Sequence, residues 1–285
     1  MEVFSEVMEL AEGYPNFKSF TLQSSRYTES GSHPMEALVF TLGELIELID
    51  QSGKNPESIF QKVLLEASVG DSHFGEIAKI KAFRLAVVQL ASAYGLDFKP
   101  ENFELLCQTS SWSKSTLDIN TNLIRQTYEA MAGVLGGANF LWVKPFQEEN
   151  STELERRIAR NVSSILKEEA YLDKVMDPAA GSFFLENQEK SMVGFLKENL
   201  KALENNGGWA KALEAGKIHH SVRSFRQKVQ TELLDSRLVK VGVNKFPASE
   251  KLKKEYPFEV FEEKSHELKP TRASYLFELQ NQSAQ

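Results

Sequence analysis

Apolar residues recur every three or four positions along most of the chain, a spacing typical of amphipathic helices. Local signals agree with this pattern, because Pro34 suits the first turn of a helix and Gly53 suits the position just beyond its end. The predicted helices span residues 1–12, 34–51, a stretch opening at 55, 72–94, 121–135, 152–170, 184–204, 208–215 and 219–235.

Shorter apolar segments alternate with these helices and read as strands. Strands that alternate with helices favour parallel pairing through helical crossovers. In such a sheet the loops at 24–32 and 108–115 should meet at one edge, the edge formed by the carboxyl ends of the strands. The strand candidates are 17–23, 103–108 and 139–144, with a fourth, strand-like piece at 238–243.

The number of strands is small for the length of the chain. An eight-stranded α/β barrel takes about 250 residues, so 285 residues would suffice. Three or four strands would not close such a barrel, and the surplus is helix. The pattern therefore predicts an α/β fold that is either not a complete barrel or the later part of one.

Composition narrows the class of protein. A hydrophobic fraction of 41% with 10% aromatic residues excludes a chain that is disordered as a whole. A net charge of −7 argues against binding to nucleic acid, which needs a basic face. No apolar run reaches the roughly 18 residues of a membrane span, and the first residues lack the pattern of a signal peptide. We expect a soluble, cytoplasmic protein without a membrane partner.

Two histidines and one cysteine are the obvious candidates for reactive or metal-binding chemistry. His219 and His220 are neighbours on a predicted helix and point in different directions, so we expect no metal there. Cys107 is the single cysteine, which excludes a disulfide framework. It has no histidine partner nearby in sequence and is expected to be a small buried residue.

The loop from Gln108 to Ser113 is the strongest candidate for binding. It combines donors and acceptors with Trp112, and would suit a polar acyl group or an amide-bearing chain. The alternative is a solvated loop with Trp112 folded back over the core. Asp71–Gly75 resembles the Asp-x-His-x-x-Gly signature of cobalamin binding, but its sixth position is Glu76, so we treat the likeness as coincidence. Asp177–Ser182 has one glycine and reads as a structural turn.

Several strings, in one order from about residue 17 to 246, resemble the methylmalonyl-CoA mutase family. The resemblance implies an α/β fold that is the later part of a TIM-type (β/α) barrel with additional C-terminal helices. It divides the chain into a partial barrel of the acyl-CoA mutase type at 1–150, a helical extension at 151–246 and a linker or C-terminal arm at 247–285. The strings are Glu76–Arg84, Gln108–Ser113, Asn122–Gly137, Arg157–Asn161, Val175–Ser182, Gly207–Gly208, Ala212–Gly216 and Gly242–Lys245.

Departures from the family pattern lie where its catalytic subunits bind substrate. Those subunits carry a Tyr-His pair after the first of these strands, whereas this chain, aligned back from Gly31, has Ser25 and Arg26. Arginine could bind an anion but is no neutral general acid. Ser111 replaces a family glycine, and Thr271–Glu278 resembles the link in the small subunit towards its degenerate cobalamin-like domain.

The resemblance therefore implies a small (beta) subunit, or a fragment of one, without catalytic residues and without a metal. Its holoenzyme would use adenosylcobalamin, with none bound by this chain, and its partner would be the catalytic subunit or the missing barrel half. Self-association and acyl-CoA binding stay open. So do two alternatives, part of a catalytic chain of a related acyl-CoA mutase and a helical interaction module. Vestigial substrate contacts are expected at Arg26, Thr28, Gln108, Ser110 and Trp112.

Overall fold

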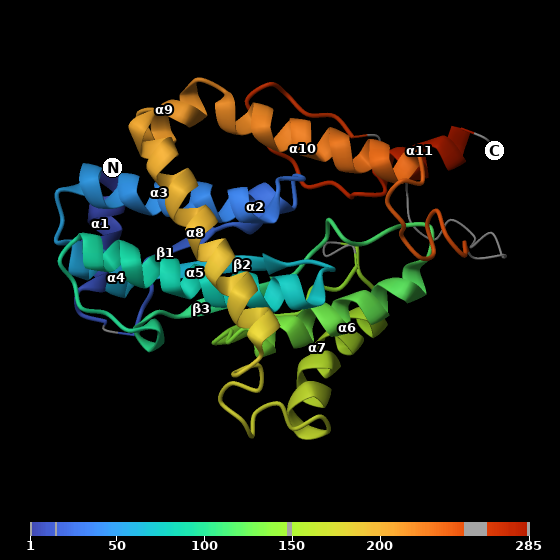
Figure 1. The fold of residues 1–285 in the computed structure, drawn as a ribbon, viewed down its shortest axis with the longest axis horizontal. Helices are drawn as coiled ribbons and strands as arrows, with labels where there is room; N and C mark the ends of the chain where they lie inside the picture. Colours follow the sequence, from blue (N-terminus) through green and yellow to red (C-terminus); the bar gives the residue numbers. More distant parts are fainter. Residues whose placement is uncertain (1, 15, 147–149, 248–260, 284–285) are drawn as a thin grey trace.

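The computed structural model describes residues 2–14, 16–146, 150–247 and 261–283, and it places one sheet among many helices (Figure 1). The strands are β1 (Phe20–Gln23), β2 (Val63–Val69), β3 (Leu105–Thr109) and β4 (Phe140–Trp142). The helices are α1 (Glu2–Ala11), α2 (Ser25–Thr28), α3 (Pro34–Ser52), α4 (Pro56–Lys62), α5 (His73–Ala93), a short 3-10 turn at Pro100–Asn102, α6 (Ile119–Leu135), α7 (Glu153–Glu168), α8 (Phe183–Asn205), α9 (Gly208–Glu214), α10 (Lys217–Leu234) and α11 (Tyr275–Ser283).

All four strands are parallel and lie in the order β1-β2-β3-β4. Every connection between neighbouring strands passes through helix: α3 and α4, then α5, then α6. The expected parallel sheet is thus confirmed, and the loops after β1 and β3 leave the same edge. This arrangement is an α/β fold consistent with part of a TIM-type barrel.

One strand was missed by the sequence prediction, and the strand-like piece at 238–243 was predicted wrongly. β2 was missed because it follows Lys62 of α4 with no turn residue between them, and its nearly continuous apolar run is typical of a strand buried on both faces. The segment 238–243 is not a strand, because it has no neighbouring strand to pair with. Its one ladder contact is an isolated bridge between Val241 and Lys245, and the turn is closed by Gly242 at φ +76°.

The outer face of the sheet carries the main hydrophobic core. Leu22, Leu65 and Cys107 project to this face and pack against buried side chains of α3 and α5. Helix α8 then crosses over α5 and α3 as a further layer (Figure 1). Because α5 lies between the sheet and α8, it is apolar nearly all round rather than on one stripe.

The inner face, which would line the lumen of a complete barrel, is covered unevenly. Residues paired across parallel strands share a face, which places Gln23, Glu66 and Trp142 on this side. Glu66 is buried, whereas Gln23 is exposed and Trp142 keeps 45% of its surface exposed. Four strands do not close around a lumen, which takes about eight. The sheet is therefore an open, partial barrel.

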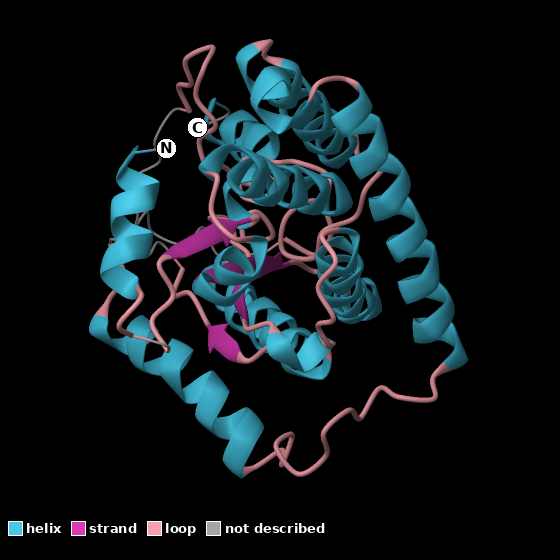
Figure 2. Ribbon diagram, turned by 90° about the vertical axis from the view of Figure 1, so that its left-hand side faces the viewer, coloured by secondary structure: helices cyan, strands magenta, loops and turns pink. Residues whose placement is uncertain are grey.

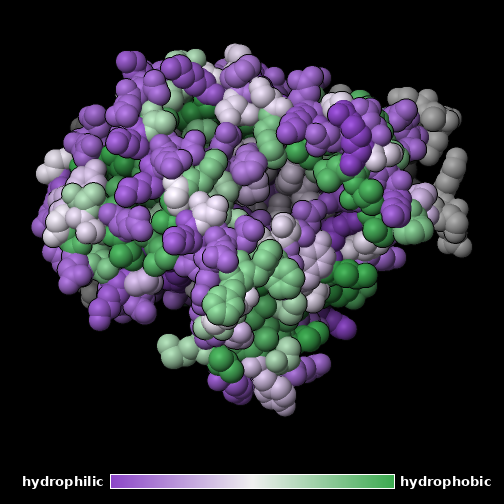
Figure 3. Space-filling model, in the orientation of Figure 1, coloured by the Kyte–Doolittle hydropathy of each residue, from purple (hydrophilic) through white to green (hydrophobic). Residues whose placement is uncertain are grey.

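The helices after β4 leave apolar side chains at the surface. Figure 2 shows α7 and α8 on opposite sides of the view, joined by the extended segment 169–182. Apolar surface gathers in the lower part of Figure 3, below the crossing of α8. None of the helices in the described ranges is long and apolar enough to cross a membrane. The exposed apolar residues of α7, the segment 169–182 and the start of α8 are Leu154, Ile165, Tyr171, Val175, Met176, Phe183 and Phe184.

Candidate functional site at the carboxyl edge of the sheet

One buried carboxylate ties together the loops that leave the sheet. Glu29, in the loop after β1, accepts a hydrogen bond from Ser68 Oγ of β2 at 2.5 Å through Oε1. Its Oε2 accepts from the backbone N–H groups of Ser111 (2.6 Å) and Trp112 (2.9 Å), in the loop after β3. Glu29 is 4% exposed, so these charge-assisted bonds act away from water. The three neighbouring strand ends are thereby held as one unit.

Gly31 allows the loop after β1 to approach α10 and Trp112. Its φ is +92°, a conformation that favours glycine. A Cβ here would lie 2.6 Å from Cβ of Arg226 and 3.0 Å from a ring carbon of Trp112. The indole of Trp112 therefore lies over Gly31 in the loop after β1, and the residues around Trp112 are largely buried rather than solvated.

A second buried group holds the loop after β3 on α6. Lys114 Nζ is paired with Oε2 of Glu129, and Ser113 Oγ donates to Oε1 of the same carboxyl at 2.5 Å. Glu129 is 0% exposed and Lys114 is 3% exposed. Burial lowers the pKa of Lys114 and raises that of Glu129, and the attraction between the two opposes both shifts. Both oxygens of Glu129 have donors, so the pair is internally satisfied.

A third carboxylate closes the edge from the C-terminal side. Glu278 Oε1 accepts from Ser115 Oγ and from the N–H of Thr116, each at 3.0 Å, and from Ser274 Oγ at 2.7 Å. Its Oε2 accepts from Arg272 Nε at 2.9 Å. Burial alone would raise the pKa of Glu278, but Arg272 and these hydrogen bonds hold it below its ordinary value.

Backbone hydrogen bonds fix the rest of this segment against the loops. Thr271 donates its N–H to the carbonyl of Glu29 at 2.8 Å, and Ala273 donates to that of Trp112 at 3.0 Å. Residues 271–278 thus lie along the carboxyl edge. The three-part division of the chain stays a prediction. Residues 271–278 of its last portion are bonded to the loops after β1 and β3, while 248–260 and 284–285 fall outside the described residues.

The fourth buried carboxylate differs from the other three. Glu66 lies on the inner face of β2 and is 1% exposed. Its Oε2 accepts from the N–H of Ser25 at 3.1 Å, whereas its Oε1 has no hydrogen-bond partner among the described residues. Burial raises the pKa of Glu66 to about 7; the charge of Glu29 adds to this, and Lys144 opposes it.

Two of the five predicted site residues point away from the edge. The guanidinium of Arg26 binds both carboxylate oxygens of Glu44 on α3, at 2.7 and 2.8 Å. Thr28 is buried, and its hydroxyl donates to the backbone carbonyls of Ser24 and Ser25 within the same turn. Both side chains therefore stabilise the local fold of the loop.

The other three lie at the edge but in different surroundings. Gln108 lies on the inner face between Ser68 and Trp142 and is 5% exposed. Ser110 is buried and continues the ladder through its N–H to the carbonyl of Val69 at 3.0 Å. Trp112 lies over Gly31. The structure thus brings Gln108, Ser110 and Trp112 to one edge without gathering them into one cluster.

Glu29, Glu66, Lys114 and Glu129 were not predicted as site residues. A signal existed for Glu66, which is a lone charge in an apolar run, and for Glu129, which is flanked by apolar residues. Such positions are buried and paired far more often than charged residues in general. The hydrogen-bond partners of these residues lie as far as 15 to 83 positions away in sequence, so the local sequence does not reveal them.

The other candidates do not join this edge. Cys107 projects to the outer face, and burial raises the pKa of its thiol to about 12, so it stays protonated and inert. His219 lies 3.1 Å from the carbonyl oxygen of His266 through Nε2. His73 starts α5 with Nδ1 3.2 Å from the carbonyl of Tyr128. Across the described ranges, no three histidine, cysteine or acidic side chains are grouped to hold a metal ion.

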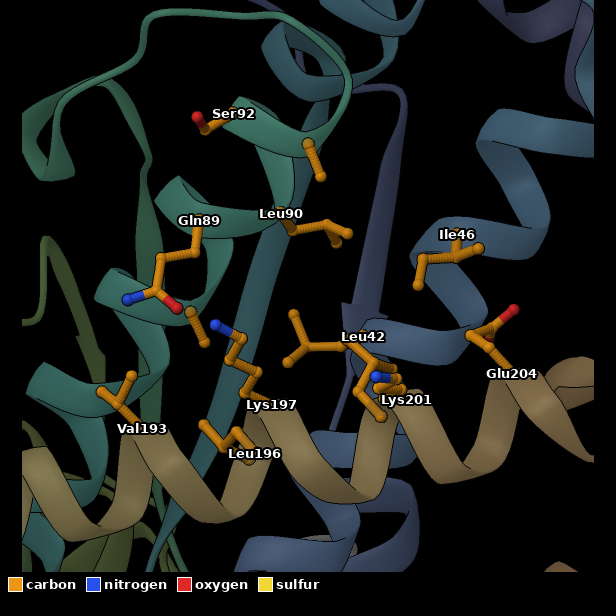
Figure 4. A pocket seen from close by; sticks show the side chains of 13 residues that line it. Leu42, Ile46, Gln89, Leu90, Ser92, Val193, Leu196, Lys197, Lys201 and Glu204 are labelled. Carbon is orange, nitrogen blue, oxygen red and sulfur yellow. The ribbon is translucent and has the colours of Figure 1, made fainter.

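A separate groove of about 680 Å³ lies in the outer helical layer, between α3, α5 and α8 (Figure 4). Leu42, Leu90 and Leu196 line its floor, and Lys197 and Lys201 stand at its rim (Figure 4). It shares no lining residue with the carboxyl edge. The groove belongs to the packing between helices and not to the site at the end of the sheet.

Comparison with known proteins places these features in a family. The family model described as "Methylmalonyl-CoA mutase" matches residues 1–285. The methylmalonyl-CoA mutase small subunit of Porphyromonas gingivalis is 30% identical over 248 residues, which cover 85% of this chain and 40% of that protein. The large subunit of the same organism is 27% identical over 270 residues, covering 92% of this chain and 37% of that protein.

Methylmalonyl-CoA mutase of Escherichia coli is 29% identical over 253 residues, which cover 86% of this chain and 35% of that protein. The chain therefore spans two fifths or less of the length of these relatives.

Proposed function

The chain belongs to the methylmalonyl-CoA mutase family, and from this premise we propose that it is part of a non-catalytic small subunit. The holoenzyme would interconvert methylmalonyl-CoA and succinyl-CoA in the cytoplasm, and this chain would stabilise the catalytic subunit in a heterodimer. The likeness to a small subunit at 30% identity supports this assignment. Mutases that are not described as small subunits are nearly as similar in sequence to this chain. The assignment to a small subunit therefore depends on the residues of the site.

The loop after β1 is the observation that carries the proposal. At the place of the substrate-binding Tyr-His pair of the family stand Ser25 and Arg26, and the guanidinium of Arg26 is bound to Glu44. A thioester carbonyl needs a hydrogen-bond donor aimed at its oxygen. The backbone N–H of Ser25 is directed to Glu66, so the two positions are engaged by carboxylates of the chain itself and carry neither the hydroxyl nor the imidazole of the Tyr-His pair.

The residues present do not fit cobalamin. His73 fails the spacing of the cobalamin signature, starts α5 rather than following a strand, and has its Nδ1 at the carbonyl of Tyr128. We therefore assign adenosylcobalamin to the catalytic subunit of the holoenzyme and derive no step through it. The carboxyl edge, where the loops of a barrel enzyme meet substrate, is lined here by residues 271–278.

The open sheet supports a partner that completes the barrel. A lumen takes about eight strands, and β1 and β4 are both edge strands here. We propose that residues 1–150 form the later half of a barrel whose other strands complete it, with 151–246 as a helical extension and 247–285 as a C-terminal arm. Gln108, Ser110 and Trp112 remain the proposed vestigial contacts for acyl-CoA, with Arg26 and Thr28 shaping the loop beside them.

Turnover and complex formation test the assignment. The purified chain with adenosylcobalamin and methylmalonyl-CoA should form no succinyl-CoA, because it lacks the Tyr-His pair. Mixed with the large subunit encoded in the same genome, it should co-elute in size-exclusion chromatography and raise the thermal midpoint of that subunit. Succinyl-CoA formation by the chain alone would instead favour a catalytic chain, and no association would favour an unrelated interaction module.

Calorimetry with methylmalonyl-CoA tests the vestigial site. If the contact persists, Gln108→Ala should weaken binding at least fivefold, because the change removes an amide on the inner face at the end of β3. Gln89→Ala, an exposed glutamine on α5 outside the edge, is the matched control and should leave binding unchanged. Equal effects of the two variants would remove Gln108 from the site.

A further inference from the structure

The inner face of the sheet holds a buried acceptor that the described residues leave unused. Glu66 is flanked in register by Gln23 of β1 and Leu106 of β3, so its side chain projects to the inner face. Its Oε2 is bonded to Ser25, and its Oε1 has no partner in the part of the chain that the structure describes. The large majority of buried side-chain polar atoms in proteins have a hydrogen-bond partner. The unused oxygen therefore marks a missing donor.

The surroundings of Glu66 favour a cation over a neutral donor. Glu29 lies close enough to repel a second negative charge, while Lys144 attracts it and the N–H of Ser25 bonds to it. With burial added, these groups leave the carboxyl with a pKa of about 7. A positive group at Oε1 would offset both the burial and the repulsion by Glu29, because a charge-assisted bond is about twice as strong as a neutral one.

Although Glu66 itself is buried, the inner face is the side of the sheet that the described residues cover least. The outer face is filled by α3 and α5, and the loop after β1 already uses Ser25 and Glu29. On the inner face, Gln23 and Trp142 beside the buried centre are exposed. In a closed barrel the inward side chains of all strands meet in layers within this space. The strands that complete the barrel would thus supply the side chain that reaches Glu66.

A second copy of the chain fits this role poorly. Two half-barrels would close by a two-fold axis along the lumen, which relates each residue to its own copy. Glu66 of one copy would then face Glu66 of the other, each beside its own Glu29. Like charges brought together in a buried space oppose assembly. A different segment, carrying a basic residue, is the better occupant.

We propose that Glu66 is the docking point for a lysine or arginine side chain carried by the barrel strands that complete this sheet. This inference rests on the proposed completion of the barrel and names the chemistry of the contact. It does not depend on whether the chain is a small subunit or part of a catalytic one.

A cation placed on the neighbouring strand tests the docking point within the chain itself. Gln23 is exposed and adjacent to Glu66 on the same face, so Gln23→Lys brings an ammonium group to the unused oxygen. At pH 8 this variant should raise the thermal midpoint by about 4 °C, and the gain should vanish in the Glu66→Gln background. Thr21→Lys, on the same strand and face beside Leu64, is the matched control and should leave the midpoint unchanged.

The outcomes separate this proposal from the proposed function. An equal effect of Gln23→Lys with and without the carboxylate, or no effect in either, would overturn the docking point, whereas the turnover and co-elution experiments would be unaffected. Sedimentation of the wild type and Glu66→Gln addresses the second copy. A dimer that tightens when Glu66 is neutralised would contradict the basic partner, and we expect no such tightening.

Discussion

The carboxyl edge and the inner face of the same sheet differ in how completely their buried charges are satisfied. At the carboxyl edge, Glu29, Glu129 and Glu278 each receive hydrogen bonds on both oxygens. Those donors come from Ser68 of β2, from the loop after β3 and from residues 272–274. At this end of the sheet, residues of the chain itself satisfy the buried carboxylates.

The inner face lacks that completeness. Glu66 has one oxygen without a partner among the described residues, although it is buried. On the same face, on β4, Phe140 and Trp142 keep 48% and 45% of their surfaces exposed. In the same sheet, the buried carboxylates of the carboxyl edge are thus fully hydrogen-bonded, whereas the inner face keeps an unsatisfied carboxylate oxygen and exposed aromatic side chains. The difference lies in the source of the donors, since residues of the chain itself supply them at the carboxyl edge but not to the second oxygen of Glu66.

Breaking the buried ion pair between Lys114 and Glu129 should lower the free energy of unfolding more than any other change considered. Glu129→Ala leaves Lys114 buried without its partner, and the loss of one member of a buried ion pair costs about 3–5 kcal/mol. Urea unfolding at pH 7 measures this loss. Replacing both residues, Lys114→Met with Glu129→Leu, should recover most of it, because no unpaired charge then remains buried. A single variant as stable as the wild type would show that the pair does not hold the loop.

Glu66 on the inner face should make the free energy of unfolding depend on pH. The pKa of Glu66 is raised from 4.5 to about 7, so the folded state holds this proton more tightly than the unfolded state. The resulting stability is fully present below pH 4.5 and is lost as the pH rises through 7, in total about 3 kcal/mol.

Unfolding of the wild type and Glu66→Gln from pH 4 to pH 8.5 measures that loss by difference. The variant should lack this part of the pH dependence. Glu12→Gln makes the same chemical change at an exposed position and should follow the wild type. Parallel curves for the wild type and Glu66→Gln would show that the carboxyl of Glu66 is not held protonated.

The exposed aromatic residues of β4 should matter least to the isolated chain. Trp142→Ser removes a side chain that is nearly half exposed, so the free energy of unfolding should change by no more than about 0.5 kcal/mol. The same change should reduce the apparent mass measured by light scattering if the inner face drives association. A loss of stability comparable to that of Glu129→Ala would mean that Trp142 is packed in solution.

Much of the helical framework was predictable from sequence because its signals are local. The observed bounds of α3, α5 and α8 lie within one or two residues of those predicted, since apolar spacing and end residues such as Pro34 and Gly53 act over a few positions. β2 was not predicted, because a strand that directly follows a helix has no boundary residue to mark it.

The sequence predicted where the candidate site lies, at the carboxyl edge of the sheet, but not which residues hold it together. Two loops meet at the carboxyl edge as expected, yet Arg26 pairs with Glu44 and the edge is held by Glu29 and Glu129 instead. Arg26 offered no clue to its partner, 18 positions away on α3. The two glutamates act through partners brought near by the fold, and a pattern of neighbours does not reveal such pairs.

Amide hydrogen exchange on the isolated chain tests the contrast between edge and face most directly. The N–H groups of Ser111, Trp112 and Thr116 are bonded to buried carboxylates and should be protected nearly as well as β2. The amides of β4, at the open side of the sheet, should exchange much faster. Protection of β4 equal to that of β2, with rapid exchange at Ser111, Trp112 and Thr116, would contradict the account.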